Sequence, residues 1–179
     1  MVERSLSMRE LVLEGKVKNS GKWAEYKRHA EEFICACIQK GSYNVNRTPG
    51  GLLWFLPWNN VQYIATATLA TTVYSIYLEA KHASLNCPAG SATPSDLIAS
   101  IKSQVGYILG VSNLINMSYM VGFGNGGNYP KQIHHRGASM ISIKKDAIPV
   151  TCKGGFEEWF HKNAPNPNVL DGAVVSPRL

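Results

Sequence analysis

The residues with the clearest chemical potential in this sequence are His134, His135 and Arg136, which stand together in a polar, glycine-rich stretch. Adjacent histidines on a polar loop rarely serve packing, and the guanidinium of Arg136 offers a planar fork of donors that suits ring hydroxyls. A solvated or purely structural tripeptide is the alternative. No neighbouring pattern requires a metal ion, so the tripeptide favours a polar binding site over a metal site.

A second group of candidate binding residues is aromatic and surrounds a turn. Trp54, Phe55, Trp58 and Tyr63 fall within ten residues. In a cleft, aromatic faces stack on the C–H faces of pyranose rings while polar neighbours bind the hydroxyls. Packing in a core is the more usual fate of such residues. The group therefore indicates either a sugar-binding surface or part of a core.

The stretch Gly122–Gly127 matches the GxGxxG pattern of dinucleotide-binding proteins. That fingerprint works only where a helix opens at its end, so that backbone N–H groups face the pyrophosphate. Here Asn128-Tyr129-Pro130 follows at once, with no helical periodicity after it. We interpret the match as fortuitous and expect no cofactor.

The bulk composition is that of an ordinary globular protein. The 179 residues are 45% hydrophobic and 17% charged, with no apolar run near the length of a membrane span. The formal charge of +6 would suit nucleic acid, but the basic residues are scattered or lie beside acids, as Lys27 and Arg28 lie near Glu31 and Glu32. We expect a solvated surface, with neither a nucleic-acid partner nor a membrane.

Cysteine usage and two sequons fit an exported protein. The cysteines are Cys35, Cys37, Cys87 and Cys152. They form no CxxC, so we expect no structural metal site. We expect at most one disulfide, between distant cysteines. The sequons begin at Asn46 and Asn116, and each is a weak signal by itself.

Apolar residues at helical spacing predict three helices. They cover about residues 22–39, 59–81 and 94–109, and a shorter helical piece is expected near Phe156. The third helix has the clearest start, with Thr93 as N-cap, Pro94 at the first position and Asp96 near the positive end of the dipole. Gly110 is its natural stop.

Long stretches without helical periodicity separate these helices. In residues 110–155, the apolar patches Tyr119–Val121 and Met140–Ile143 are candidates to pair as short strands. The proline-containing stretch Asn163–Asn168 is expected to be a rigid structural loop. Loops of this length usually carry function.

Six stretches of the chain fit one pattern when they are taken in order. They are GKWAEYKRHAEEFIC (21–35), RTPGGLLWFLPWNNVQY (47–63), SYMVGFG (118–124), IHHRGAS (133–139), VTCKGGFEEWFHKNAPNPN (150–168) and DGAVVS (171–176). Together they resemble the plant endo-β-1,4-glucanases (cellulases) of glycoside hydrolase family 9. One such match would be weak, whereas six in order are highly specific.

The resemblance implies an all-α fold. Helices of this family form two concentric rings in an (α/α)6 barrel, and long loops at one end line an open substrate cleft. Residues 1–179 would then be a single, partial catalytic domain, truncated at both ends. The helix-and-long-loop pattern agrees with this expectation.

The resemblance also assigns roles to individual residues. It makes His134 the active-site histidine and Arg136 a hydroxyl-binding arginine. Trp58 and Tyr63 match aromatic positions that line the sugar cleft, and Trp54 matches a third. The chain departs from the family in having three residues, Asn125–Gly127, where one is usual between the flanking glycine and asparagine.

The implied activity is inverting hydrolysis of internal β-1,4-glucosidic bonds in cellulose-like glucans. Such a reaction needs one carboxylate to activate water and one carboxylic acid to protonate the leaving oxygen. Asp96, Asp146 and Asp171 match none of the family's catalytic positions, so the pair is expected outside these residues. The alternative is an inactive glucan-binding or inert product. We further expect a β-1,4-glucan partner, a monomer, and a secreted or cell-wall location.

Overall fold

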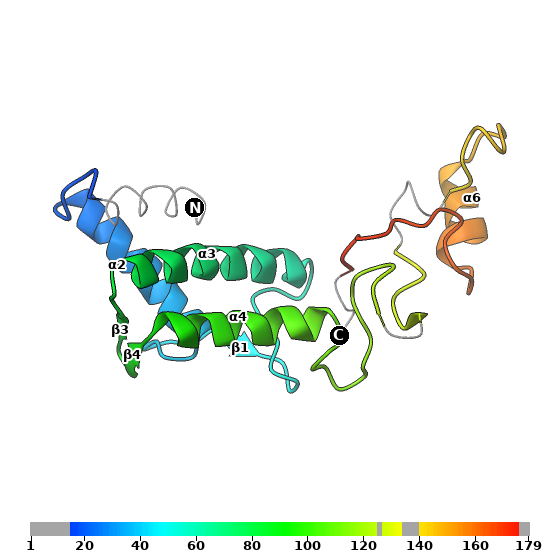
Figure 1. The fold of residues 1–179 in the computed structure, drawn as a ribbon. Helices are drawn as coiled ribbons and strands as arrows, with labels where there is room; N and C mark the ends of the chain where they lie inside the picture. The colour runs from blue at the N-terminus through cyan, green and yellow to red at the C-terminus, as the bar shows by residue number, and fades with distance from the viewer. Residues whose placement is uncertain (1–14, 125–126, 134–139, 176–179) are drawn as a thin grey trace. The chain divides into compact units, whose positions relative to one another are not determined.

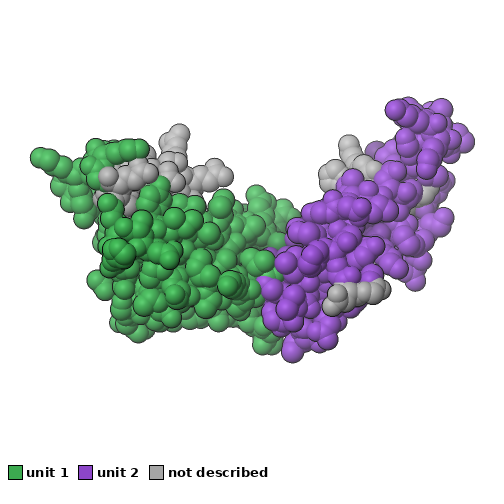
Figure 2. All heavy atoms as spheres, viewed as in Figure 1, with its two compact units in different colours: residues 1–105 green, residues 106–179 purple. Residues whose placement is uncertain are grey.

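The computed structural model describes residues 15–124, 127–133 and 140–175. The chain forms two compact units, residues 1–105 and residues 106–179 (Figure 2). None of the described helices is long and apolar enough to cross a membrane. The expected single domain stays a prediction.

Three helices make up most of the first unit (Figure 1). They are α2 (Lys22–Cys37), α3 (Asn60–Ala80) and α4 (Pro94–Ile108), whose last turn extends into the second unit. Two antiparallel strand pairs accompany them: β1 (Asn46–Arg47) with β2 (Leu53–Trp54), and β3 (Leu85–Cys87) with β4 (Gly90–Ala92). The helices expected from periodicity are confirmed, with boundaries that differ by at most two residues.

The core of the first unit draws on all three helices and on the β3–β4 pair. Its buried members are Ile34, Cys35, Tyr74, Leu78, Leu85, Ala92 and Leu97. Tyr74 and Leu78 lie four residues apart on α3 and so share one face of that helix. Burial of such side chains stabilises the unit, because apolar area removed from water contributes about 25 cal/mol per Å².

A disulfide joins Cys35 of α2 to Cys87 of β3, with the two Cα atoms 5.6 Å apart. This agrees with the prediction of at most one disulfide between distant cysteines. Of the other two thiols, Cys37 is buried and Cys152 is exposed. Cys35 and Cys37 take different environments because residues two apart point to different sides of a helix.

We expect a thiol reagent to modify Cys152 and to leave Cys37 intact. Burial raises the pKa of the Cys37 thiol to about 12, so the reactive thiolate is scarce in weak base. Brief treatment with iodoacetamide at about pH 8 should therefore add one group per chain, located by mass spectrometry in the peptide that contains Cys152. Labelling in urea is the control, where both thiols should react. Equal labelling of the two thiols without urea would contradict the burial of Cys37.

The start of α4 is capped as the sequence predicts. Thr93 Oγ1 accepts a hydrogen bond from the Asp96 N–H at 3.2 Å, and the Thr93 N–H donates to Asp96 Oδ2 at 2.8 Å. This is a capping box with aspartate in the glutamate position. Hydrogen bonds from the backbone and hydroxyl of Thr93 lower the pKa of the Asp96 carboxyl. Beyond the other end, Gly110 has a φ of +81°, and a Cβ there would lie 2.6 Å from the Ser118 nitrogen.

The second unit contains little regular structure among its described residues. The helical piece expected near Phe156 is present, as α6 (Cys152–Gly155) followed by the π-helix η2 (Phe156–Phe160). Thr151 caps α6 by accepting a hydrogen bond from the Gly154 N–H at 3.0 Å.

The strand pairing expected for Tyr119–Val121 is wrong, because its partner is residues 173–175 rather than Met140–Ile143. The Val121 N–H donates to the Ala173 carbonyl at 2.9 Å, and the Val175 N–H donates to the Tyr119 carbonyl at 2.8 Å. All these patches are short and apolar, so hydrophobicity alone does not select the partner.

Candidate functional site

Residues 48–78 contain no charged side chain. Their first part, residues 48–59, is a loop that includes strand β2 and carries Trp54 and Trp58, and Tyr63 follows near the start of α3. Thr48 starts this loop. Its N–H donates to the Leu52 carbonyl at 2.8 Å, and its Oγ1 accepts from the Leu52 N–H at 3.1 Å. Leu52 and Leu53 are buried beneath the loop. The loop is therefore anchored to the unit by both hydrogen bonds and apolar burial.

Gln104 of α4 holds one side of strand β2. Its side chain is 2% exposed. The Oε1 atom accepts a hydrogen bond from the Leu53 N–H at 2.8 Å, and Nε2 donates to the Gly51 carbonyl at 3.1 Å. Because a buried amide without partners costs about 1–3 kcal/mol, these two bonds fix the loop to α4.

Asn60, the first residue of α3, holds the other side. Its side chain is 1% exposed. Nδ2 donates to the Leu53 carbonyl at 2.8 Å, and Oδ1 accepts from the Phe55 N–H at 2.8 Å. Both backbone groups of Leu53 are thus bound by buried amides from two different helices. These hydrogen bonds therefore also fix the backbone of Trp54, the residue that follows Leu53.

The aromatic residues of this loop and of the start of α3 are neither uniformly buried nor uniformly exposed. Trp58 is 63% exposed and Tyr63 is 39% exposed, whereas Trp54 is half-buried. The Tyr63 ring packs on Phe55 with centroids 6.2 Å apart, and Phe55 packs on Phe33 of α2, also at 6.2 Å. Among the described residues, neither Trp54 nor Trp58 meets another ring. Tyr63 is therefore a surface aromatic whose ring is held by packing on Phe55, and Trp58 is the more exposed of the two.

His134 and Arg136 lie outside the described residues. The residues that flank them, Ile133 and Met140, belong to the second unit, whereas Trp54, Trp58 and Tyr63 belong to the first. Within the described ranges, no group of three or more His, Cys, Asp or Glu side chains is placed to hold a metal ion.

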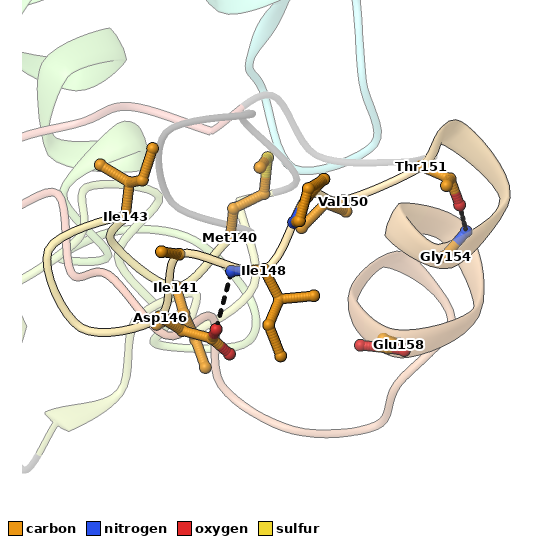
Figure 3. A pocket seen from close by; sticks show the side chains of 11 residues that line it. Met140, Ile141, Ile143, Asp146, Ile148, Val150, Thr151, Gly154 and Glu158 are labelled. Carbon is orange, nitrogen blue, oxygen red and sulfur yellow. Dashed lines mark hydrogen bonds between the residues drawn. The ribbon is translucent and has the colours of Figure 1, made fainter.

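The second unit also contains a cavity of about 500 Å³ that none of the predicted site residues line (Figure 3). Its lining is mainly apolar, with Met140, Ile143 and Ile148 among the members. Asp146 and Glu158 supply its carboxylates, and Asp146 Oδ1 accepts a hydrogen bond from the Ile148 N–H at 3.0 Å. Through that bond Asp146 stabilises the backbone turn in which it lies.

Two residues of the first unit that matter for the site were missed by sequence reasoning. Gln104 stands between Ile101 and Val105 in the apolar stripe of α4, and Asn60 stands at the start of α3. A polar amide within an apolar stripe is the one signal that could have identified Gln104. The sequence offered no comparable signal for Asn60.

Helices joined by long loops, with exposed aromatics on an uncharged stretch of chain, define a helical protein with a candidate binding surface, and the comparisons with known proteins specify its family. The model of the glycosyl hydrolase family 9 matches residues 3–176, so the chain belongs to that family. The predicted resemblance to its plant endoglucanases is confirmed.

Curated relatives include Endoglucanase 15 of Arabidopsis thaliana, 60% identical over 167 residues, which are 93% of this chain and 33% of the relative. Endoglucanase 14 of the same plant is 61% identical over 166 residues, with the same shares covered. Endoglucanase 15 of Oryza sativa subsp. japonica is 48% identical over 151 residues, covering 84% of this chain and 24% of the relative. The chain therefore spans about a third of the length of its Arabidopsis relatives, or less.

Solved structures agree on the fold. The cellulase Cel9M of C. cellulolyticum superposes with a TM-score of 0.59 at 24% identity, covering 97% of this chain and 30% of that one. Its structure in complex with cellobiose gives a TM-score of 0.60, with the same identity and coverage. The expected fold is confirmed: the chain is mostly helical and matches part of the (α/α)6 barrel of the family.

Proposed function

We propose that this chain is the glucan-binding part of an endo-β-1,4-glucanase that hydrolyses internal bonds of cellulose-like polysaccharide with inversion. Family membership supports the reaction class. The observation that carries the binding role is the uncharged stretch 48–78, from which Trp58 and Tyr63 are exposed. Aromatic faces next to uncharged polar groups suit a neutral sugar chain better than they suit a charged ligand.

Each predicted site residue has a distinct task in this proposal. Trp58 and Tyr63 stack on glucose rings, and Trp54 on strand β2 offers a third aromatic position for the sugar chain. The guanidinium of Arg136 donates hydrogen bonds to sugar hydroxyls. His134 binds a hydroxyl close to the bond that is cleaved. The two carboxylates that move protons in an inverting reaction come from elsewhere in the protein.

A secreted, monomeric protein without a cofactor is the setting we propose. Disulfides form and persist in oxidising compartments, so the Cys35–Cys87 bond supports export. The sequons at Asn46 and Asn116 agree with it, and both asparagines are exposed.

We expect calorimetric titration of the chain with cellohexaose to give binding that sodium chloride barely changes, because stacking and neutral hydrogen bonds release no counterions. Trp58→Ala and Tyr63→Ala should each weaken it roughly tenfold, the equivalent of about 1.4 kcal/mol. Tyr43→Ala is the matched control, since Tyr43 is an exposed tyrosine outside the loop. Binding that falls steeply with salt, or an equal loss in the control, would refute the glucan-binding surface.

The chain alone is expected to show no hydrolytic activity, both under the proposed function and under its alternative, an inactive glucan-binding or inert product. The chain's Asp96, Asp146 and Asp171 match no catalytic position of the family, so carboxymethylcellulose should yield no reducing ends above a buffer blank. Turnover by protein free of contaminating cellulase would show instead that a carboxylate of this chain performs the chemistry.

A further inference from the structure

The loop that follows α4 exposes three large apolar side chains. Val111 is 76% exposed, Leu114 is 82% exposed and Ile115 is 57% exposed. Single exposed apolar residues are common on protein surfaces, but a soluble protein usually covers or uses a local concentration of them. We call these three residues the apolar tip. Their concentration indicates that a group outside the loop covers them.

A buried amide holds the apolar tip in its exposed position. Asn113 is 4% exposed. Its Nδ2 donates hydrogen bonds to the Tyr107 carbonyl at 2.8 Å and to the Met117 carbonyl at 2.7 Å, and its Oδ1 accepts one from the Met117 N–H at 3.2 Å. These bonds fix the backbone on both sides of Leu114 and Ile115. The exposure of the two side chains is therefore a property of the folded loop.

Asn116 directly follows the apolar tip and has an exposed side chain. Its φ of +48° lies in the left-handed region, which asparagine tolerates better than most residues. Its N–H donates to the Asn113 carbonyl at 3.3 Å, and its carbonyl accepts a hydrogen bond from Asn128 Nδ2 at 2.6 Å. Within the described ranges, its side-chain amide forms no hydrogen bond. The backbone of Asn116 is therefore fixed, while its amide nitrogen is available for attachment of another group.

We propose that Asn116 carries an N-linked glycan and that this glycan covers the apolar tip. Asn116-Met117-Ser118 is an acceptor sequon, and a glycan attached to such a site is bulky and solubilising. The first N-acetylglucosamine presents ring C–H groups and an acetyl methyl, which suit contact with Leu114 and Ile115. The inference rests on the export that forms part of the proposed function, and the Cys35–Cys87 disulfide supports that export.

The modification is a group transfer from a lipid-linked sugar diphosphate. A C–N bond forms between Asn116 Nδ2 and the anomeric carbon of the first N-acetylglucosamine, the C–O bond to the diphosphate breaks, and the amide loses one proton. Ser118 is 1% exposed, and its Oγ accepts a hydrogen bond from the Met120 N–H at 3.0 Å. Because the sequon requires that hydroxyl, the transfer takes place before this loop folds.

The experiment expresses the chain behind a cleavable signal peptide in eukaryotic cells, so that it meets the transferring enzyme whatever its natural location. Asn116→Gln removes the sequon. Asn46→Gln is the matched control, since Asn46 is an exposed sequon asparagine whose neighbours, the half-buried Val45 and the charged Arg47, expose no apolar tip.

Two measurements are made on each sample. Trypsin separates the sequons, because Asn116 lies in the peptide 103–131 and Asn46 in the peptide 41–47. Mass spectrometry after enzymatic deglycosylation in heavy-oxygen water then identifies each occupied asparagine as a labelled aspartate. Hydroxyl-radical footprinting measures how fast Leu114 and Ile115 are oxidised in the folded chain, with the exposed Val169 of the same unit as the internal reference.

We expect Asn116 to be occupied in most molecules of the parent chain. Leu114 and Ile115 should be oxidised severalfold faster in Asn116→Gln than in the glycosylated parent, because the sugar no longer shields them. The parent deglycosylated after folding should show the same increase, which separates loss of the glycan from a folding defect of the variant. The rate for Val169, and all rates in Asn46→Gln, should match those of the parent.

An unmodified Asn116 in the exported chain would overturn the proposal. Equal oxidation of Leu114 and Ile115 with and without the glycan would also overturn it, since the glycan would then cover neither side chain. Cellohexaose titration of the same samples keeps the two proposals apart. A glycosylated, shielded chain that binds no cellohexaose would support the glycan at Asn116 and refute the glucan-binding surface, and an unglycosylated chain that binds cellohexaose would do the reverse.

Discussion

Replacing Cys35 and Cys87 together by serine is expected to lower the free energy of unfolding of the first unit by about 4 kcal/mol. The disulfide closes a loop that spans 52 positions of the sequence. Cross-linking a loop of this size restricts the unfolded chain strongly, so its removal favours the unfolded state. Urea denaturation followed by far-UV circular dichroism measures the change, because α2, α3 and most of α4 lie in this unit.

The matched control for the disulfide is Cys152→Ser, which removes an exposed thiol in the other unit. It should leave the urea midpoint within experimental error. Reduction of the parent chain with dithiothreitol should reproduce the effect of the double variant. If the oxidised and reduced chains unfold at the same urea concentration, the Cys35–Cys87 bond contributes nothing to stability and the prediction fails.

Gln104→Met is expected to lower the free energy of unfolding by about 2–4 kcal/mol, because it keeps the size of the side chain but deprives one buried and one partly buried backbone group of their partners. These groups are the Leu53 N–H and the Gly51 carbonyl. The loss should appear first in the loop, as faster hydrogen exchange of the Leu53 amide, and then in the urea midpoint. Weaker cellohexaose binding should accompany it, since Trp54 follows Leu53 directly.

Gln62→Met provides the comparison for Gln104→Met. Gln62 lies on α3 in the same unit, but its side chain is exposed. Its replacement should change stability by less than about 0.5 kcal/mol. An unchanged exchange rate for the Leu53 amide in Gln104→Met would mean that the Gln104 amide does not hold strand β2.

Local signals in the sequence were sufficient to predict the helices. The spacing of apolar residues located α2, α3 and α4, and the Thr93–Asp96 pair marked the start of α4 because a capping box involves only four neighbouring residues. The barrel class followed from six ordered motifs rather than from periodicity. These features were predictable because each is written in a short stretch of chain.

Features that depend on contacts between distant residues were not predictable. The partner of Tyr119–Val121 lies more than fifty residues further along the chain, and Gln104 binds Leu53 across 51 positions. The pairing of Cys35 with Cys87 also joins distant residues, 52 positions apart, and could not be predicted from local sequence. The stretch Asn163–Asn168 was expected to be a rigid structural loop, and the hydrogen bonds of Asn166 with Ile133 and of Asn168 with Met140 span 33 and 28 positions of the sequence, so local signals could not predict them.

The binding of the Leu53 backbone by two buried side-chain amides has a consequence for how this surface can evolve. Strand β2 is bound on one side by Gln104 of α4 and on the other by Asn60 of α3. A substitution that slides either helix along its axis would pull one amide away from Leu53 and leave the other in place, tilting the peptide that carries Trp54. Relatives should therefore either keep both amides or replace both at once. A lineage that had lost one of the two would be expected to show a compensating donor or acceptor at the same point of the loop.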